Sequence, residues 1–107
     1  MDLGDLFKQA KAMQEKAQAL QDDLARVEVE GASGGGMVRV TMTGKFEIKR
    51  VHIDPSFLKP EEQGVVEDLI VAASNDARAK AERAASEQMQ KLTAGLGLPP
   101  GFKLPGM

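Results

Sequence analysis

Apolar side chains in the first 27 residues recur at alternating steps of four and three, and this heptad spacing predicts a long amphipathic helix over residues 3–27. At 1.5 Å per residue the helix would be about 37 Å long. A chain of 107 residues has too little core to cover such a stripe, so the stripe needs a second helix, a second copy of the chain, or both. Its members are Leu6, Ala10, Met13, Ala17, Leu20, Leu24 and Val27.

After residue 27 the apolar period falls to two, which is typical of strands. Residues 27–31 and 37–43 predict two strands joined by a flexible glycine-rich turn. The run Gly34, Gly35 and Gly36 lacks the Lys-Ser/Thr of a phosphate-binding loop and leads toward a strand, so a hairpin is the better interpretation. In the second strand apolar side chains face one way and polar ones the other: Val38, Val40 and Met42 against Arg39, Thr41 and Thr43.

A tight turn at Gly44 and Lys45 leads into a third predicted strand over residues 46–54. Here the alternation slips, because Ile48 and Val51 are three positions apart. One extra residue near Lys49 and Arg50 would restore the facing, so we predict a β-bulge there.

A second helix is predicted from Pro60, a residue favoured in a first helical turn, to about Leu92. Its apolar stripe is rich in alanine, which lets a neighbouring element approach closely. The stripe comprises Val66, Ile70, Ala73, Ala77, Ala81 and Ala84.

The element order predicts a single α+β domain over residues 1–94, with a three-stranded antiparallel meander covered on one face by helices. Residues 95–107 are rich in glycine and proline and form a tail that cannot continue the helix. A sheet this small has exposed edges, and pairing across a homodimer would protect them.

Composition excludes several classes of function. The chain has 14 basic and 16 acidic residues, a net charge of −2, so it lacks the globally basic character of a simple nucleic-acid binder. It has no cysteine and one histidine, which excludes thiolate chemistry and a multi-histidine metal site. No nucleophile–base pair can be assembled, so we expect neither an enzyme nor a small-molecule substrate. No apolar run approaches a membrane span and no secretory signal is present, so we expect a cytoplasmic protein with no membrane partner.

Charge is nevertheless unevenly distributed. The local net charge is +3 over residues 39–50 and +2 over 77–92, but −4 over 59–76. Such polarisation allows phosphate binding by an acidic chain, because a two-fold axis doubles each patch. The alternative is that these charges only solvate the helices.

Several motifs, in this order, resemble the YbaB/EbfC family of bacterial nucleoid-associated proteins. They are Lys-Ala-Met-Gln-Glu-Lys at 11–16, the glycine-rich turn and Val-Arg-Val strand at 31–40, Ile-Asp-Pro-Ser at 53–56, Glu-Asp-Leu-Ile-Val-Ala-Ala-x-Asn-Asp-Ala at 67–77, and Lys-Leu-Thr-Ala-Gly-Leu-Gly-Leu-Pro-Pro-Gly at 91–101. The resemblance implies a tweezer-shaped homodimer that binds duplex DNA in the nucleoid, without cofactor or catalysis.

The resemblance does not decide which basic residues touch DNA. We predict phosphate contacts with weak sequence preference, because no helix-turn-helix or zinc-finger spacing is present. A rival hypothesis is a protein-interaction module that uses its helices and its tail to recruit a partner and associates with DNA only indirectly. The predicted contact residues are Lys8, Lys11 and Lys16 on the first helix, and Arg78, Lys80 and Arg83 on the second.

Overall fold

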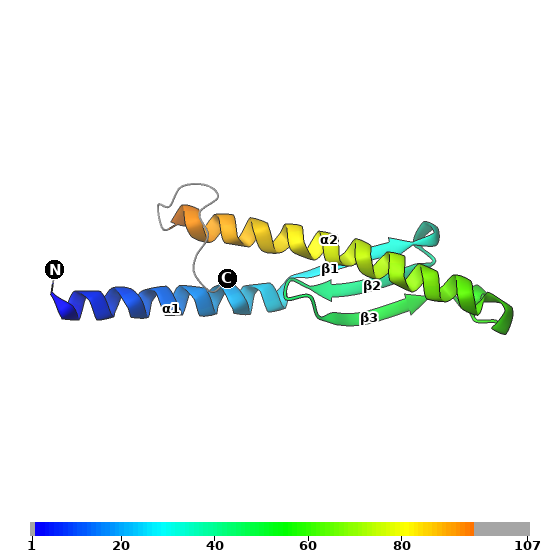
Figure 1. Cartoon of the computed structure of the whole chain (residues 1–107), viewed down its shortest axis with the longest axis horizontal. Helices are drawn as coiled ribbons and strands as arrows, with labels where there is room; N and C mark the ends of the chain where they lie inside the picture. The colour runs from blue at the N-terminus through cyan, green and yellow to red at the C-terminus, as the bar shows by residue number, and fades with distance from the viewer. Residues whose placement is uncertain (1, 96–107) are drawn as a thin grey trace.

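The chain folds into two long helices and one antiparallel sheet with strand order β1-β2-β3 (Figure 1). The computed structural model describes residues 2–95. The predicted α+β class and the predicted meander are confirmed. The elements are α1 (Leu3–Arg26), β1 (Glu28–Ser33), β2 (Val38–Thr43), β3 (Ile48–Ile53) and α2 (Gln63–Gly95).

Helix α1 projects beyond the end of the sheet (Figure 1). Its start is capped by Asp2, whose carboxylate accepts the Gly4 N–H at 2.8 Å. Only Val27, with an extended backbone, separates α1 from β1, so the chain has no loop in which to reverse direction. The expectation that both helices cover the sheet is therefore wrong: among residues 2–95, α2 covers it and α1 contacts it far less than α2 does.

The heptad stripe of α1 is covered only at its C-terminal end. Leu20 and Leu24 are buried, whereas Leu6 is 47% exposed and Met13 is 43% exposed. Residues 2–95 therefore leave most of the stripe without a partner.

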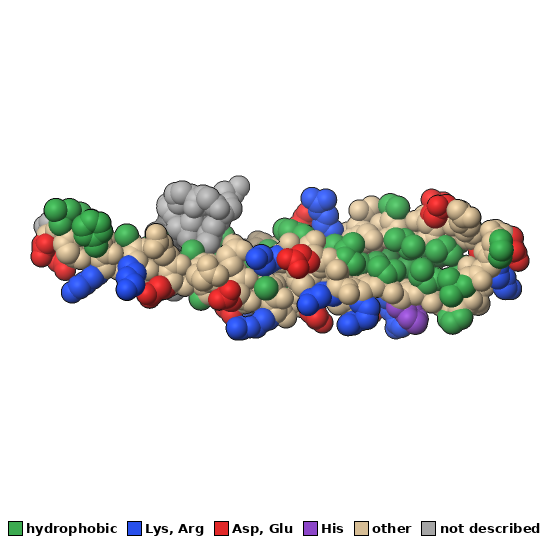
Figure 2. All heavy atoms as spheres, turned by 90° about the horizontal axis from the view of Figure 1, so that it is seen from below, with side chains coloured by type: hydrophobic (Ala, Val, Ile, Leu, Met, Phe, Trp, Pro, Cys, Tyr) green, Lys and Arg blue, Asp and Glu red, His purple; other side chains and the backbone are tan. Residues whose placement is uncertain are grey.

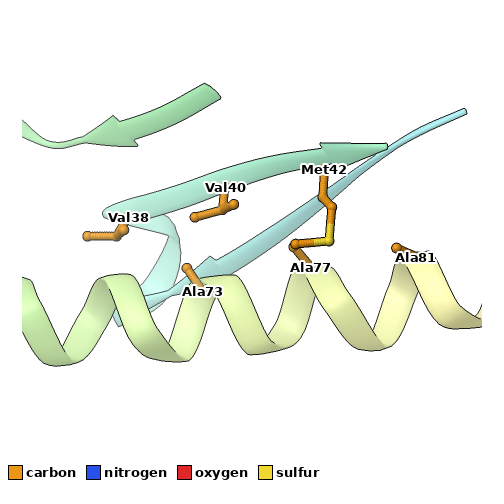
Figure 3. Packing of buried hydrophobic residues seen from close by; sticks show 6 residues of the cluster. All are labelled: Val38, Val40, Met42, Ala73, Ala77 and Ala81. Atoms are coloured by element: carbon orange, nitrogen blue, oxygen red, sulfur yellow. The ribbon is translucent and has the colours of Figure 1, made fainter. Parts of the chain in front are cut away.

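The sheet packs on α2 through apolar residues of β2 and three alanines (Figure 3). Val38 and Val40 are fully buried, as the alternation predicts. Because alanine has a small side chain, the β2 residues lie close to the helix axis. The core consists of Val38, Val40, Met42, Ala73, Ala77 and Ala81.

The predicted β-bulge is confirmed. Thr41 pairs with Arg50 and Met42 pairs with Ile48, so Lys49 is the extra residue on β3. The bulge keeps Ile48 and Val51 on the face of the sheet that carries Met42 and Val40, their pairing partners.

The β2–β3 connection is longer than the predicted Gly44-Lys45 turn. Residues 44–47 form it, and Phe46 has a φ of 67°, in the left-handed region that bulky residues rarely adopt. The Thr43 hydroxyl accepts the N–H groups of Lys45 and Glu47 at 3.2 and 3.3 Å. Thr43 is therefore buried under the turn, although the alternation puts it on the polar face.

Two boundaries of α2 differ from prediction. Pro60 opens a 3-10 turn, Pro60–Glu62, and α2 begins after it at Gln63. The helix continues to Gly95, so the predicted domain boundary at residue 94 falls within its last turn. The rest of the predicted tail, residues 96–107, lies outside the described residues.

The molecule is elongated, with extents of 70 × 21 × 16 Å and a radius of gyration of 19.3 Å. A compact domain of this length would have a radius of gyration of about 13 Å. The part of the chain that the structure describes consequently leaves much of the apolar surface of α1 and β3 uncovered, as the exposure of Leu6, Met13, Ile48 and Val51 shows.

Candidate nucleic-acid interface

The three predicted contact residues of α1 are all exposed. At 3.6 residues per turn, Lys8 and Lys11 lie on the side opposite the apolar stripe, and Lys16 lies nearer to the stripe. Since this part of α1 extends past the sheet, Lys8 and Lys11 face solvent and can meet an anionic surface without rearrangement.

The three predicted residues of α2 do not form one patch. Arg78 is exposed and pairs with Glu82, with 3.3 Å between Nε and Oε1. Arg83 has no carboxylate within ion-pair distance among residues 2–95. At helical spacing, Arg78 and Arg83 lie on different sides of α2.

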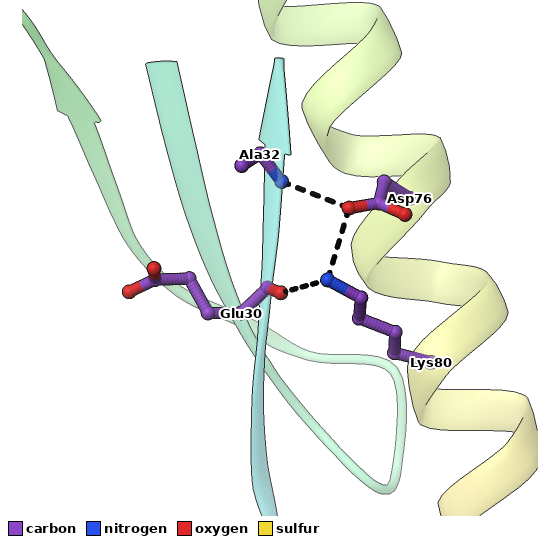
Figure 4. Close-up of polar contacts among 4 residues, drawn as sticks. All are labelled: Glu30, Ala32, Asp76 and Lys80. Carbon is purple, nitrogen blue, oxygen red and sulfur yellow. Dashed lines mark hydrogen bonds and ion pairs between the residues drawn. The ribbon is translucent and has the colours of Figure 1, made fainter. Parts of the chain in front are cut away.

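Lys80 reaches toward the sheet, although its side chain stays 43% exposed (Figure 4). Its Nζ donates to the Glu30 carbonyl at 2.8 Å and lies 3.2 Å from Oδ2 of Asp76. Asp76 also accepts the Ala32 N–H at 3.0 Å. That bond, followed by the contacts with Lys80, holds the pKa of Asp76 below its usual 3.8. The ammonium of Lys80 is thus engaged in a contact between α2 and β1.

A second basic cluster lies on the sheet face opposite α2. Pairing places Arg39 beside His52 and Thr41 beside Arg50. Arg39, Arg50 and His52 are all exposed. The sequence indicated a positive segment here, but the bulge and the register bring these three side chains together. The position of Arg39 between the buried valines Val38 and Val40 was the sequence signal that could have placed it on the exposed face of the sheet.

Figure 2 shows how charge and apolar surface are arranged on the side where β3 lies. Hydrophobic side chains gather over the sheet half of the molecule, and Lys and Arg side chains line one border of this patch. Ile48 is 54% exposed and Val51 is 44% exposed. This surface therefore combines an uncovered apolar strip with a basic margin.

A crevice of about 310 Å³ separates the end of α2 from α1. Lys16 and Lys91 both line it, although they are 75 positions apart in the chain. Leu20 and Leu92 form part of its apolar wall. The crevice brings together Lys16, a predicted DNA-contact residue, and Lys91, for which the sequence predicted no DNA contact.

Residues 1–96 match the model of the YbaB/EbfC DNA-binding family. This chain belongs to that family. Membership confirms the resemblance seen in the sequence motifs. Within residues 2–95, no helix is long and apolar enough to cross a membrane.

Relatives in the YbaB/EbfC family match nearly end to end. A nucleoid-associated protein of Nitrobacter hamburgensis is 57% identical over 103 residues, covering 96% of this chain and 97% of the relative. One from Methylocella silvestris is 55% identical, covering 97% of each chain. The crystal structure of the uncharacterized protein HP0035 from Helicobacter pylori matches with a TM-score of 0.67 at 26% identity, covering 90% of this chain and 97% of that one.

Proposed function

We propose that this protein is a nucleoid-associated, non-enzymatic protein that binds duplex DNA as a homodimer with weak sequence preference. Membership of a DNA-binding family and the nucleoid-associated relatives support DNA as the ligand and the nucleoid as the location. The observation that carries the proposal is the projection of α1, which presents Lys8 and Lys11 to solvent on the side away from its apolar stripe.

The uncovered apolar surface supports a homodimer. The exposed half of the α1 stripe and the apolar residues of β3 have no covering element among residues 2–95. Contiguous apolar surface of this kind marks protein contact sites. A second copy would cover it, and two-fold symmetry would double each basic cluster.

The exposed lysines support contacts to phosphates more than to bases. Lysine side chains are long and flexible and end in an ammonium group. Among residues 2–95, α1 is followed by a strand and is not part of a helix-turn-helix, the motif that places a recognition helix in the major groove. Contacts to the backbone position a protein on DNA without reading sequence directly. We therefore expect DNA bending or bridging by the two projecting helices and, through it, effects on gene expression.

The direct test is fluorescence anisotropy of a labelled duplex, titrated with nucleic-acid-free protein at several salt concentrations. We expect saturable binding. The logarithm of the association constant should fall linearly with the logarithm of the salt concentration, with a slope of about −0.9 per neutralised phosphate. Sedimentation velocity on the same sample should give a dimer. Absence of binding at low salt would contradict the proposed function.

A second candidate function is a protein-interaction module, which the apolar tip of α1 favours. Leu3 is 68% exposed and Phe7 is 71% exposed. In this case the helices recruit another protein and contact with DNA is indirect. Deleting the predicted tail, residues 95–107, separates the two functions, since loss of partner recruitment with unchanged DNA affinity would favour the module.

A further inference from the structure

The two edges of the sheet are unequal. On β1, which is an edge strand, the Ala32 N–H donates to Oδ2 of Asp76 at 3.0 Å, and the Glu30 carbonyl accepts from Nζ of Lys80 at 2.8 Å. Both backbone groups point away from β2 and are among the groups to which another strand would bind. Figure 4 shows the two side chains reaching from α2 to this edge. Nζ of Lys80 lies 3.2 Å from Oδ2 of Asp76.

Helix and strand geometry explain why these two side chains fit. Asp76 and Lys80 are four residues apart, which is about 6 Å along a helix. Glu30 and Ala32 are two residues apart, which is about 7 Å along a strand. The matched spacings let each side chain reach one backbone group.

The close approach of strand and helix depends on Gly31, which lies between the two bonded groups. A Cβ at Gly31 would come within 2.2 Å of the carbonyl oxygen of Ala73 and of the amide nitrogen of Ala77. Because the residue has no side chain, β1 lies directly on α2 and its outer edge comes within reach of Asp76 and Lys80.

The β3 edge has no such cover among the described residues. Its residues are exposed except for the half-buried Ile53, and it carries the apolar side chains of Ile48 and Val51 on the side facing α2. A surface that is apolar and next to an open strand edge fits a second copy of this chain.

We propose that Asp76 and Lys80 form an edge guard, which closes β1 to strand addition and restricts self-association to the β3 side. A sheet with two open edges can add copies in both directions, whereas one open side gives a closed pair. The guard thereby limits assembly to two copies. The inference rests on the proposed homodimer for its final size, but not for closure of β1.

The test compares two ion pairs on the same helix. The double variant Asp76→Ala/Lys80→Met removes the guard. The control Arg78→Met/Glu82→Ala removes a pair of the same four-residue spacing, 3.3 Å apart, with both side chains largely exposed. Sedimentation velocity over a wide concentration range gives the size of each, and circular dichroism gives the helical content.

We expect the control to keep the parent's size and the guard variant to form species larger than a dimer, in proportions that rise with concentration. A natively folded guard variant of the parent's size would overturn the inference. A monomeric parent would instead count against the proposed homodimer, and the guard would then still predict that the variant gains one additional copy or more.

A measurement on the parent keeps the inference testable if the double variant fails to fold. Hydrogen exchange at the Ala32 amide should be slowed at least about tenfold relative to an unstructured peptide, because Asp76 accepts this N–H. Exchange at the unstructured rate would overturn the guard. The variant Asp76→Asn, which retains an acceptor oxygen for Ala32, should preserve both the slow exchange and the parent's size.

Discussion

Gly31 of β1 lies against the backbone of α2, where an added Cβ would approach the Ala73 carbonyl oxygen to 2.2 Å. A contact this short with backbone, unlike one with a flexible side chain, can be relieved only by moving the strand or the helix. The separation between β1 and α2 is therefore set by the absence of a side chain at one position.

Replacing Gly31 by alanine should lower the free energy of unfolding by about 2–3 kcal/mol, because overpacking displaces β1 from α2. Urea denaturation followed by circular dichroism measures the change. The control is Gly64→Ala, since a Cβ there meets nothing within 4 Å and alanine favours a helix. A Gly31→Ala protein as stable as the control would contradict the observed packing.

The bond from Ala32 and the contacts with Lys80 lower the pKa of Asp76, so its carboxylate stabilises the folded state only when ionised. This stabilisation is fully present above the ordinary pKa of 3.8 and is lost as pH falls through the lower folded-state value. The stability difference between the parent and Asp76→Asn should therefore shrink below about pH 4. Denaturation series at several pH values measure it, and a pH-independent difference would contradict the linkage.

Met42 is 5% exposed and packs in the core against α2. Truncation by Met42→Ala should cost about 2–4 kcal/mol, from lost apolar burial and the cavity left behind. Thermal or urea unfolding checks this at a protein concentration low enough to avoid self-association. A loss below about 1 kcal/mol would show that the α2–β2 interface collapses around the cavity.

Ile48 is 54% exposed on the β3 side, so within one chain its replacement by glutamate has little to disrupt. If a second copy covers this side, Ile48→Glu should weaken the dimer about tenfold or more by burying a charge. Sedimentation equilibrium measures the dissociation constant. Val65→Glu, at a 46% exposed position near the start of α2, is the control and should leave it unchanged; equal constants for the two variants would exclude the β3 side.

For DNA, the double variant Lys8→Gln/Lys11→Gln should lower affinity and reduce the salt slope by about one unit for each phosphate contact removed. Lys59→Gln, in the segment before the start of α2, controls for the loss of positive charge, because that end of α2 lies at the other end of the molecule from the start of α1 (Figure 1). Anisotropy titrations at three or more salt concentrations give both quantities. A slope unchanged by the α1 variant would move the interface to the Arg39, Arg50 and His52 cluster on the sheet.

The sequence by itself determined the elements and their order, because each carries its own periodicity. The heptad steps predicted α1, the alternation predicted β2, and the irregular step from Ile48 to Val51 predicted a bulge near Lys49 and Arg50. Local patterns of this kind depend on which side of a helix or strand is buried. They can therefore be recognised in the sequence without knowing which element packs against that side.

Only the tertiary structure decided what each polar side chain does. Lys80 and Arg83 are both basic residues on the same helix, yet Lys80 bonds to the Glu30 carbonyl and Arg83 has no ion-pair partner among residues 2–95. The direction of α1 was also undecided, because its stripe specifies a side to cover and not the element that covers it. These outcomes depend on contacts between residues up to 50 positions apart, which a local sequence pattern does not encode.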